Sequence, residues 1–144
     1  MNHEDIEMGE VRTKIKIINA LDEMMARRGQ LSSSQVRVYE ADASVDTGSV
    51  RSVLPPQVVQ QLGLAVRGQR VAEYADGRKE MVGVTEPIIV DWQGRDTLEE
   101  ALVLGDEVIL SQTVLGKLDL LADCARHQLV PNPAHPDQPV SKVK

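Results

Sequence analysis

Short extended segments separated by turn residues are the feature that most constrains the fold of this chain. Residues 69–74 and 79–84 flank the turn Ala75-Asp76-Gly77. An Asp-Gly pair between two extended segments is a strong hairpin signal, because glycine tolerates the positive φ that the turn needs. Further strands are predicted over residues 11–18, 36–45, 50–54, 87–91, 97–104, 108–110, 120–122 and 128–130.

Helical patterns are short. Pro55 and Pro56 open a helix that ends at Gly63, since proline suits a first helical turn and glycine suits the residue after the last one. A second short helix is predicted over residues 112–118, and a surface helix over 19–28. The chain has no Phe, one Trp and two Tyr, so Val, Leu, Ile and Ala must fill the core. Because Val and Ile favour strands, we expect a single, mainly β domain that forms a closed antiparallel barrel.

Charge and residue usage exclude several classes of partner. The formal charge of −6 argues against nucleic acid, which attracts basic surfaces. No run of 18 apolar residues exists, so we expect no membrane partner. Cys124 is the one cysteine, and residues 1–5 lack the basic-then-apolar order of a signal peptide, which together predict a cytoplasmic protein. His3, His127 and His135 are widely spaced, so neither a metal nor another cofactor is expected.

The tetrapeptide Asp46-Thr47-Gly48-Ser49 follows the predicted strand 36–45 and places a carboxylate on a sharp turn. An acid–base hydrolase needs this arrangement when two carboxylates face each other across a water. Only one such tetrapeptide occurs in the chain, so the second carboxylate is either absent or supplied by another copy. The alternative interpretation is an ordinary turn closed by an Asx hydrogen bond.

The order of these elements resembles the retropepsin-like aspartic peptidases, in particular their single-domain prokaryotic members. The resemblance covers about residues 11–133, including the stretch 114–123 and the segment 129–133. It implies a closed antiparallel β-barrel of the acid-protease type, with two short helices and one flap hairpin. An N-terminal segment, 1–10, and a tail, 134–144, would lie outside this domain, and the tail has little that could pack.

The resemblance also implies roles for the tetrapeptide. Asp46 would be the catalytic carboxylate of an aspartic endopeptidase, and Thr47 would hydrogen-bond across to the same loop of a partner. Gly48 would allow close approach of backbone and substrate, and Ser49 would donate to the outer oxygen of Asp46. With one motif per chain, the site implies an isologous homodimer acting on peptide or protein substrates.

The hairpin turn would then be the flap that covers the substrate, comprising Tyr74, Ala75, Asp76 and Gly77. Two of these residues have simpler interpretations, which we favour. Tyr74 is explained as a strand aromatic, and Asp76 as a turn-forming residue.

The chain departs from the family pattern at Ile109-Leu110-Ser111, where the family places glycine after two aliphatic residues. The side chain of Ser111 would sit where backbones pack tightly and displace the loop that holds Asp46. Alternatively, Ser111 is the N-cap of the helix that follows it. This departure keeps a second function open, a catalytically impaired dimerisation or peptide-binding module.

Two further differences concern charged residues. Retroviral members pair an Arg with an Asp beside this site, whereas the matching positions here are Gln112 and Val50, so that no charge is left unpaired. Glu99 and Glu100 are expected to belong to a solvated face.

Overall fold

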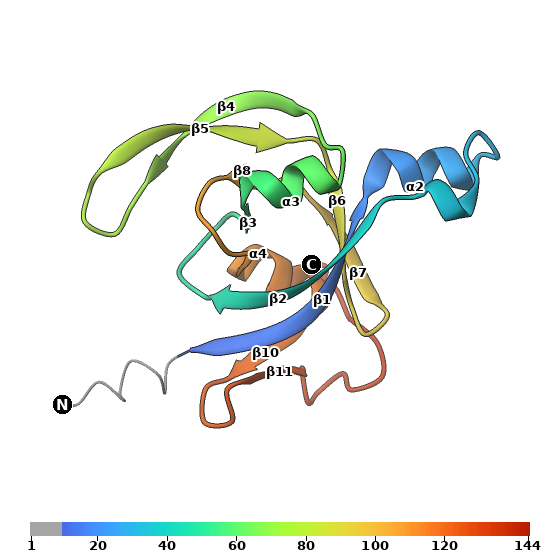
Figure 1. Ribbon diagram of the computed structural model, residues 1–144. Helices are drawn as coiled ribbons and strands as arrows, with labels where there is room; N and C mark the ends of the chain where they lie inside the picture. The colour runs from blue at the N-terminus through green and yellow to red at the C-terminus, as the bar shows by residue number, and fades with distance from the viewer. Residues whose placement is uncertain (1–9) are drawn as a thin grey trace.

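The computed structural model describes residues 10–144, which fold around one curled β-sheet (Figure 1). The helices are α2 (Ala20–Arg27), α3 (Pro56–Gln61) and α4 (Gln112–Leu118), with a 3₁₀ turn, η1, over Ser33–Gln35. The strands are β1 (Val11–Asn19), β2 (Val38–Asp46), β3 (Val53–Leu54), β4 (Val66–Glu73), β5 (Lys79–Thr85), β6 (Ile88–Trp92), β7 (Arg95–Glu99), β8 (Leu102–Val103), β9 (Ile109–Ser111), β10 (Leu120–Asp123) and β11 (Gln128–Pro131).

The long strands β1 and β2 are interior neighbours in the sheet and run antiparallel, with Val11 opposite Val45. Burial follows the two-residue period of a strand, since Val11, Ile15 and Ile17 all face the core. β6 pairs with the other edge of β1 over the second half of its length. The prediction of a strand over residues 11–18 is confirmed.

The sheet is mixed and open, which corrects the expectation of a closed, wholly antiparallel barrel. Its strand order is β4-β5-β8-β3-β9-β2-β1-β6-β7, so β4 and β7 are its two outer strands in the described part of the chain. β2 and β9 run parallel, with Asp46 opposite Ser111. β3 and β8 are also parallel. Parallel pairing requires a long crossover, and residues 47–108 supply it between β2 and β9.

Aliphatic side chains fill the inside of the curl, where α3 and α4 also lie (Figure 1). Trp92 donates its indole N–H to Thr13 Oγ1 over 2.8 Å, so its polar atom is satisfied at the margin of the core. The predicted aliphatic core is therefore confirmed. Its largest fully buried side chains include Ile17, Leu54, Leu62, Ile88, Leu110, Leu115 and Leu118.

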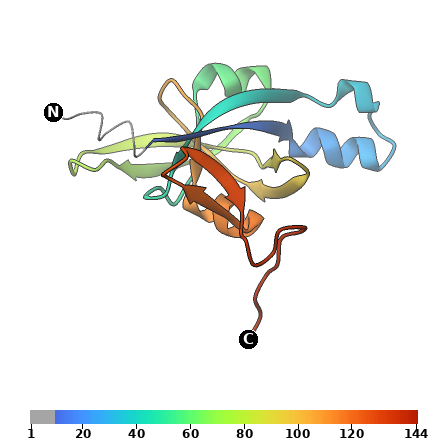
Figure 2. The ribbon, with the colours of Figure 1, turned by 90° about the horizontal axis from the view of Figure 1, so that it is seen from below.

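β10 and β11 form a separate two-stranded sheet, with Leu120 opposite Pro131. This corrects the expectation that these strands belong to one closed barrel. The following segment is also better attached than its composition suggested. Arg95 donates to the carbonyl oxygen of His135 over 2.9 Å. The Asp119 carboxylate accepts from the backbone N–H of Val140 over 3.0 Å. Two backbone contacts therefore tie the tail to the body, although residues 136–144 remain exposed, and the chain end points away from the body (Figure 2).

The surface helix predicted over residues 19–28 is confirmed as α2, which projects from one end of the sheet (Figure 1). Asn19 caps it by accepting from the N–H of Asp22 over 3.0 Å. The nearly buried Asp22 carboxylate accepts two hydrogen bonds from the Arg37 guanidinium, at 2.8 and 3.0 Å. These bonds hold the pKa of Asp22 below its usual value. Within residues 10–144, no helix has the length and apolarity that crossing a bilayer requires.

Candidate active site

Asp46 is the last residue of β2 and lies exposed at the start of a tight turn. Its Oδ1 accepts from the N–H of Gly48 over 2.9 Å, and its carbonyl oxygen accepts from the N–H of Ser49 over 3.1 Å. A Cβ at Gly48 would lie 3.4 Å from Asp46 Oδ1, an ordinary van der Waals contact. Thr47 lies exposed in the same turn. The local geometry is thus an Asx turn that holds one carboxylate oxygen and leaves the other accessible.

Ser49 does not have the hydrogen bond that the resemblance implied. Its hydroxyl donates to the carbonyl oxygen of Arg51 over 2.6 Å, and so does not donate to Asp46. The carbonyl oxygen of Ser49 accepts from the N–H of Gln112 over 2.8 Å. In a single chain, Ser49 therefore stabilises the loop that carries Asp46 and makes no hydrogen bond to the Asp46 carboxylate.

The first turn of α4 holds this loop from a segment distant in sequence. Besides the Gln112 contact, the Thr113 hydroxyl donates to the carbonyl oxygen of Val50 over 2.8 Å. These contacts involve Val50 and Gln112, the two positions that the resemblance matches to the Arg–Asp pair of retroviral members. Hydrogen bonds to main-chain carbonyls replace an ion pair here, so the absence of both charges leaves the loop supported.

Ser111 is fully buried next to the Asp46 turn, and Ile109 and Leu110 precede it in β9. Its hydroxyl accepts from the N–H of Val114 over 3.1 Å, which confirms the predicted N-cap of α4. The same hydroxyl donates to Glu99 Oε2 over 3.0 Å. The polar side chain is thus fully partnered, and β2 and β9 still pair in parallel at Asp46. The expected displacement of the loop has no counterpart in this geometry.

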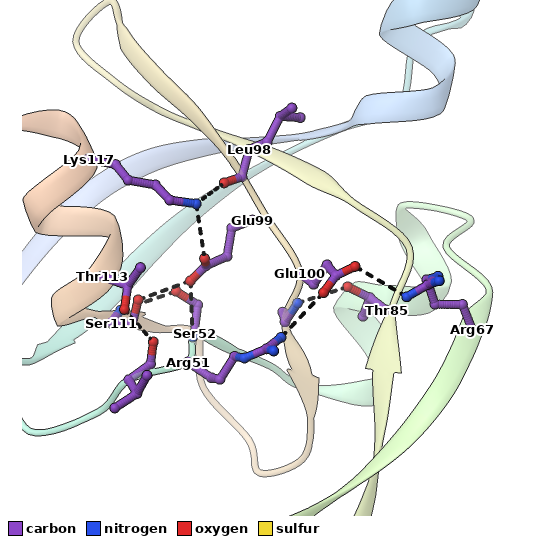
Figure 3. A network of polar contacts seen from close by, with 12 residues as sticks. Arg51, Ser52, Arg67, Thr85, Leu98, Glu99, Glu100, Ser111, Thr113 and Lys117 are labelled. Carbon is purple, nitrogen blue, oxygen red and sulfur yellow. Dashed lines mark hydrogen bonds and ion pairs between the residues drawn. The ribbon is translucent and has the colours of Figure 1, made fainter. Parts of the chain in front are cut away.

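Glu99 is buried beside this site, which corrects the expectation that it belongs to a solvated face. Its side chain is only 6% exposed, and Lys117 Nζ lies 3.9 Å from its Oε1. Figure 3 shows its carboxylate between Lys117 of α4 and Ser52. The sequence carries no signal for this burial, because the two-residue period of β7 groups Glu99 with Arg95 and Thr97 on a face that would be expected to be polar. Glu100, on the other face, pairs with Arg51 and Arg67.

The predicted hairpin is confirmed as β4–β5, with Gly77 at φ 89° in its turn. Asp76 Oδ1 accepts from the N–H of Arg78 over 3.0 Å, so its interpretation as a turn-forming residue is confirmed. The Tyr74 hydroxyl donates to Glu80 over 2.5 Å, and this bond raises the pKa of Tyr74. Ala75 lies exposed between them. The hairpin extends well away from the body of the molecule (Figure 1).

A hollow lies between this hairpin and the segment that follows β8. Tyr74, Val82 and Leu104 contribute to its walls, and Asp46 is not among its lining residues. Of the residues predicted for the site, the structure thus brings together the Asp46 turn and Ser111, whereas the tip of the hairpin stands apart from them (Figure 1). Within residues 10–144, no group of three or more His, Cys, Asp or Glu side chains could hold a metal ion.

Comparisons with known proteins identify the fold. Neither a protein-family model nor a curated protein matches the chain. Among solved structures, the chain is similar to the retroviral protease-like domain of Ddi1 from Leishmania major, with 17% identity, a TM-score of 0.52 and coverage of 85% of this chain and 90% of that chain. This chain therefore has the retropepsin-like fold.

Two similarities with lower TM-scores were also found. One is to EIAV protease complexed with the inhibitor HBY-793, with 20% identity, a TM-score of 0.46 and coverage of 72% of this chain and 85% of that chain. The other is to a retropepsin-like aspartic protease from Rickettsia conorii, with 15% identity, a TM-score of 0.45 and coverage of 80% and 85%.

Proposed function

We propose that this chain is an aspartic-type endopeptidase that hydrolyses peptide bonds with an Asp-activated water, in an active site shared by two copies. The observation that carries the proposal is the position of Asp46. Its carboxylate lies exposed on an Asx turn, and β9 and α4 support the backbone around it from beneath. The retropepsin-like fold supports the same conclusion.

The chemistry requires two carboxylates, and Asp46 supplies one per chain. When two copies place their Asp46 side chains together, the like charges cannot both ionise readily, so the pair shares one proton. The ionised carboxylate takes a proton from the attacking water, and the protonated one donates to the oxygen of the scissile carbonyl. The pH dependence then belongs to the pair as a unit. Thr47 of each copy would hydrogen-bond across to the loop of the other.

The proposed dimer is isologous, with the two Asp46 loops at its two-fold axis. Two terminal segments are candidates for its interface, residues 11–18 and residues 128–130. β1 is paired with β2 along its length and with β6 over its second half, so the β10–β11 hairpin is the better candidate. Its Leu121 is 47% exposed, and burying such a side chain between two copies would favour association.

The flap in this proposal is the β4–β5 hairpin, which would close over an extended peptide and exclude water. Tyr74 and Val82 line the hollow beside it, and Gly77 gives its turn the required backbone conformation. The substrate would bind as a strand between the flap and the loop of Asp46.

A non-catalytic dimerisation or peptide-binding module was the alternative, and the buried serine at position 111 was its motive. Because the hydroxyl of Ser111 has partners in both Glu99 and Val114, no specific observation now favours impaired geometry. The peptidase remains the proposal.

The test is cleavage of a peptide library between pH 3 and pH 7 by the purified chain and by the Asp46→Asn variant. We expect cleavage by the first alone, with inhibition by a statine-type transition-state mimic. Sedimentation at the assay concentration gives the oligomeric state in parallel. No cleavage by a folded, dimeric chain, or equal cleavage by Asp46→Asn, would overturn the proposal.

A further inference from the structure

Glu99 differs from the other buried carboxylate, Asp22, in how its charge is compensated. Asp22 has a guanidinium as partner, whereas the nearest cation to Glu99 is Lys117 Nζ, at 3.9 Å. The close partners of Glu99 Oε2 are neutral donors, the N–H of Ser52 at 3.3 Å and the hydroxyl of Ser111 at 3.0 Å. A carboxylate removed from water requires such donors. Ser111 is opposite Asp46 across β2 and β9, and Ser52 follows the Asp46 turn in the chain.

We infer that Glu99 is a positioning residue for the catalytic loop, and that Glu99 and Ser111 act together to hold the loop's two ends in register. This inference rests on the proposed peptidase function, which it deepens by assigning a residue that supports the Asp46 site. Neither side chain contacts a substrate in this account. Both act through the backbone of residues 46–52.

The loop begins at Asp46 and ends at Ser52, and Ser111 contacts both ends. It is the parallel neighbour of Asp46 across β2 and β9, and its N–H donates to Ser52 Oγ over 3.1 Å. Glu99 binds the N–H of Ser52, and Leu102 donates its N–H to the carbonyl oxygen of Ser52 over 2.9 Å. Ser52 is therefore held through its amide, carbonyl and hydroxyl groups. Because the whole cluster is buried, losing one partner leaves another polar group unsatisfied.

This arrangement gives the serine at position 111 a use. A glycine there would fit the family pattern but would remove the hydroxyl that Glu99 Oε2 accepts from. It would also remove the cap of α4. We therefore expect Ser111→Gly to loosen the catalytic loop and to lower activity. If the serine instead impaired the site, the same substitution would raise activity.

The first experiment measures amide hydrogen exchange by NMR in wild type and in Glu99→Gln. A charged acceptor is replaced by a neutral one of the same shape, so the Ser52 amide should exchange about fivefold faster. The amide of Ile17, in the middle of the sheet, reports global opening, and the ratio of the two rates removes any general loss of stability. Glu100→Gln is the matched control, because Glu100 pairs with Arg51 and Arg67 and accepts no main-chain bond of the loop. It should leave the ratio unchanged.

The second experiment measures cleavage by the same variants with a peptide substrate. Misplacing Asp46 should lower kcat about tenfold in Glu99→Gln with KM nearly unchanged, since remote misplacement acts on the reacting geometry. Ser111→Gly should act in the same direction. Combining it with Glu99→Gln should give less than the product of the two effects, because one substitution weakens and the other removes the same hydrogen bond.

The two readouts separate the two proposals. An unchanged ratio of Ser52 to Ile17 exchange in Glu99→Gln overturns the role of Glu99, whatever the activity. A higher ratio of Ser52 to Ile17 exchange in Glu99→Gln, with no cleavage by wild type, supports the role of Glu99 and contradicts the peptidase. Multiplicative effects of Glu99→Gln and Ser111→Gly on the exchange ratio would overturn their joint action.

Discussion

The loop that carries Asp46 and the hairpin β4–β5 are held in opposite ways. The loop is supported by residues far away in sequence, since Gln112 and Thr113 bind two of its carbonyl groups and Glu99 binds the N–H of Ser52. The contacts at the tip of the hairpin are local. The Tyr74 hydroxyl reaches only to Glu80, six residues along the chain.

In the proposed peptidase, this difference would serve two requirements. A group that activates water must stay in place while charge develops, and buried long-range contacts provide that preorganisation. A cover must open and close, and segments with few buried contacts open at low free energy. The comparison predicts that substitutions beneath the loop have large effects, while substitutions at the tip of the hairpin have small ones.

The largest effect is expected from Asp46→Asn. Removing the proton-accepting carboxylate should lower kcat/KM by about 10²–10⁴-fold. The amide oxygen still accepts from the N–H of Gly48, and the side chain is exposed, so the fold should be unaffected. Peptide cleavage assays and thermal unfolding measure the two properties. Full activity in a folded Asp46→Asn variant would show that the Asp46 loop takes no part in the chemistry.

A large stability effect is expected from Leu110→Ala, directly before Ser111 beneath the loop. Leu110 is 1% exposed, and truncating such a side chain destabilises a protein by about 2–5 kcal/mol. Met81→Ala in the hairpin is the matched control, because Met81 is 59% exposed and should change the free energy of unfolding by less than about 0.5 kcal/mol. Urea denaturation compares them. Equal losses of stability in the two variants would contradict the contrast between the supported Asp46 loop and the β4–β5 hairpin.

A smaller difference concerns acid stability. The pKa of Asp22 is lowered by its hydrogen bonds to Arg37, and that of Asp76 by its bonds to Arg78. A carboxyl whose folded pKa is depressed stabilises the protein above its unfolded pKa, and this stability is lost as the pH falls through the folded value.

Asp22 is nearly buried and Asp76 is exposed, so only the first should contribute measurably. We expect Asp22→Asn to lower the free energy of unfolding by about 1–2 kcal/mol at pH 7 and to flatten its decline below about pH 4. Asp76→Asn should leave the curve as in wild type. Denaturation across pH 2–7 measures both variants. A larger effect of Asp76→Asn than of Asp22→Asn would contradict the argument that the buried carboxylate contributes more.

The smallest effect is expected from Tyr74→Phe. The substitution removes one hydrogen bond to Glu80 at the surface of the hairpin, which should change the free energy of unfolding by less than about 0.5 kcal/mol. It should also change kcat/KM less than about twofold. Thermal unfolding and cleavage assays measure this. A tenfold loss of activity would assign Tyr74 a direct contact with the substrate.

Local signals explain what could be predicted from the sequence. The Asp-Gly turn and the two prolines before α3 each have a preferred conformation within a few residues, and both elements form as expected. The N-cap at Ser111 is of the same kind. The tetrapeptide at Asp46 is also a local signal, because its turn is closed by its own Asx hydrogen bond.

What could not be predicted depends on segments far apart in sequence. Nothing near Glu99 indicates that its carboxylate lies under a loop 47 residues earlier. The β10–β11 hairpin forms its own sheet, and its edges carry no sequence mark that distinguishes this from closing a barrel. The attachment of the tail depends on Arg95 and Asp119, neither of which adjoins it.

The central claim is that two copies form one active site from two Asp46 side chains. The measurement that tests it most directly is calorimetric titration of the purified chain with a statine-type transition-state mimic at mildly acidic pH. We predict saturation at one mimic per two chains, and loss of binding in Asp46→Asn. Saturation at one mimic per chain, or binding that Asp46→Asn leaves unchanged, would contradict a shared site.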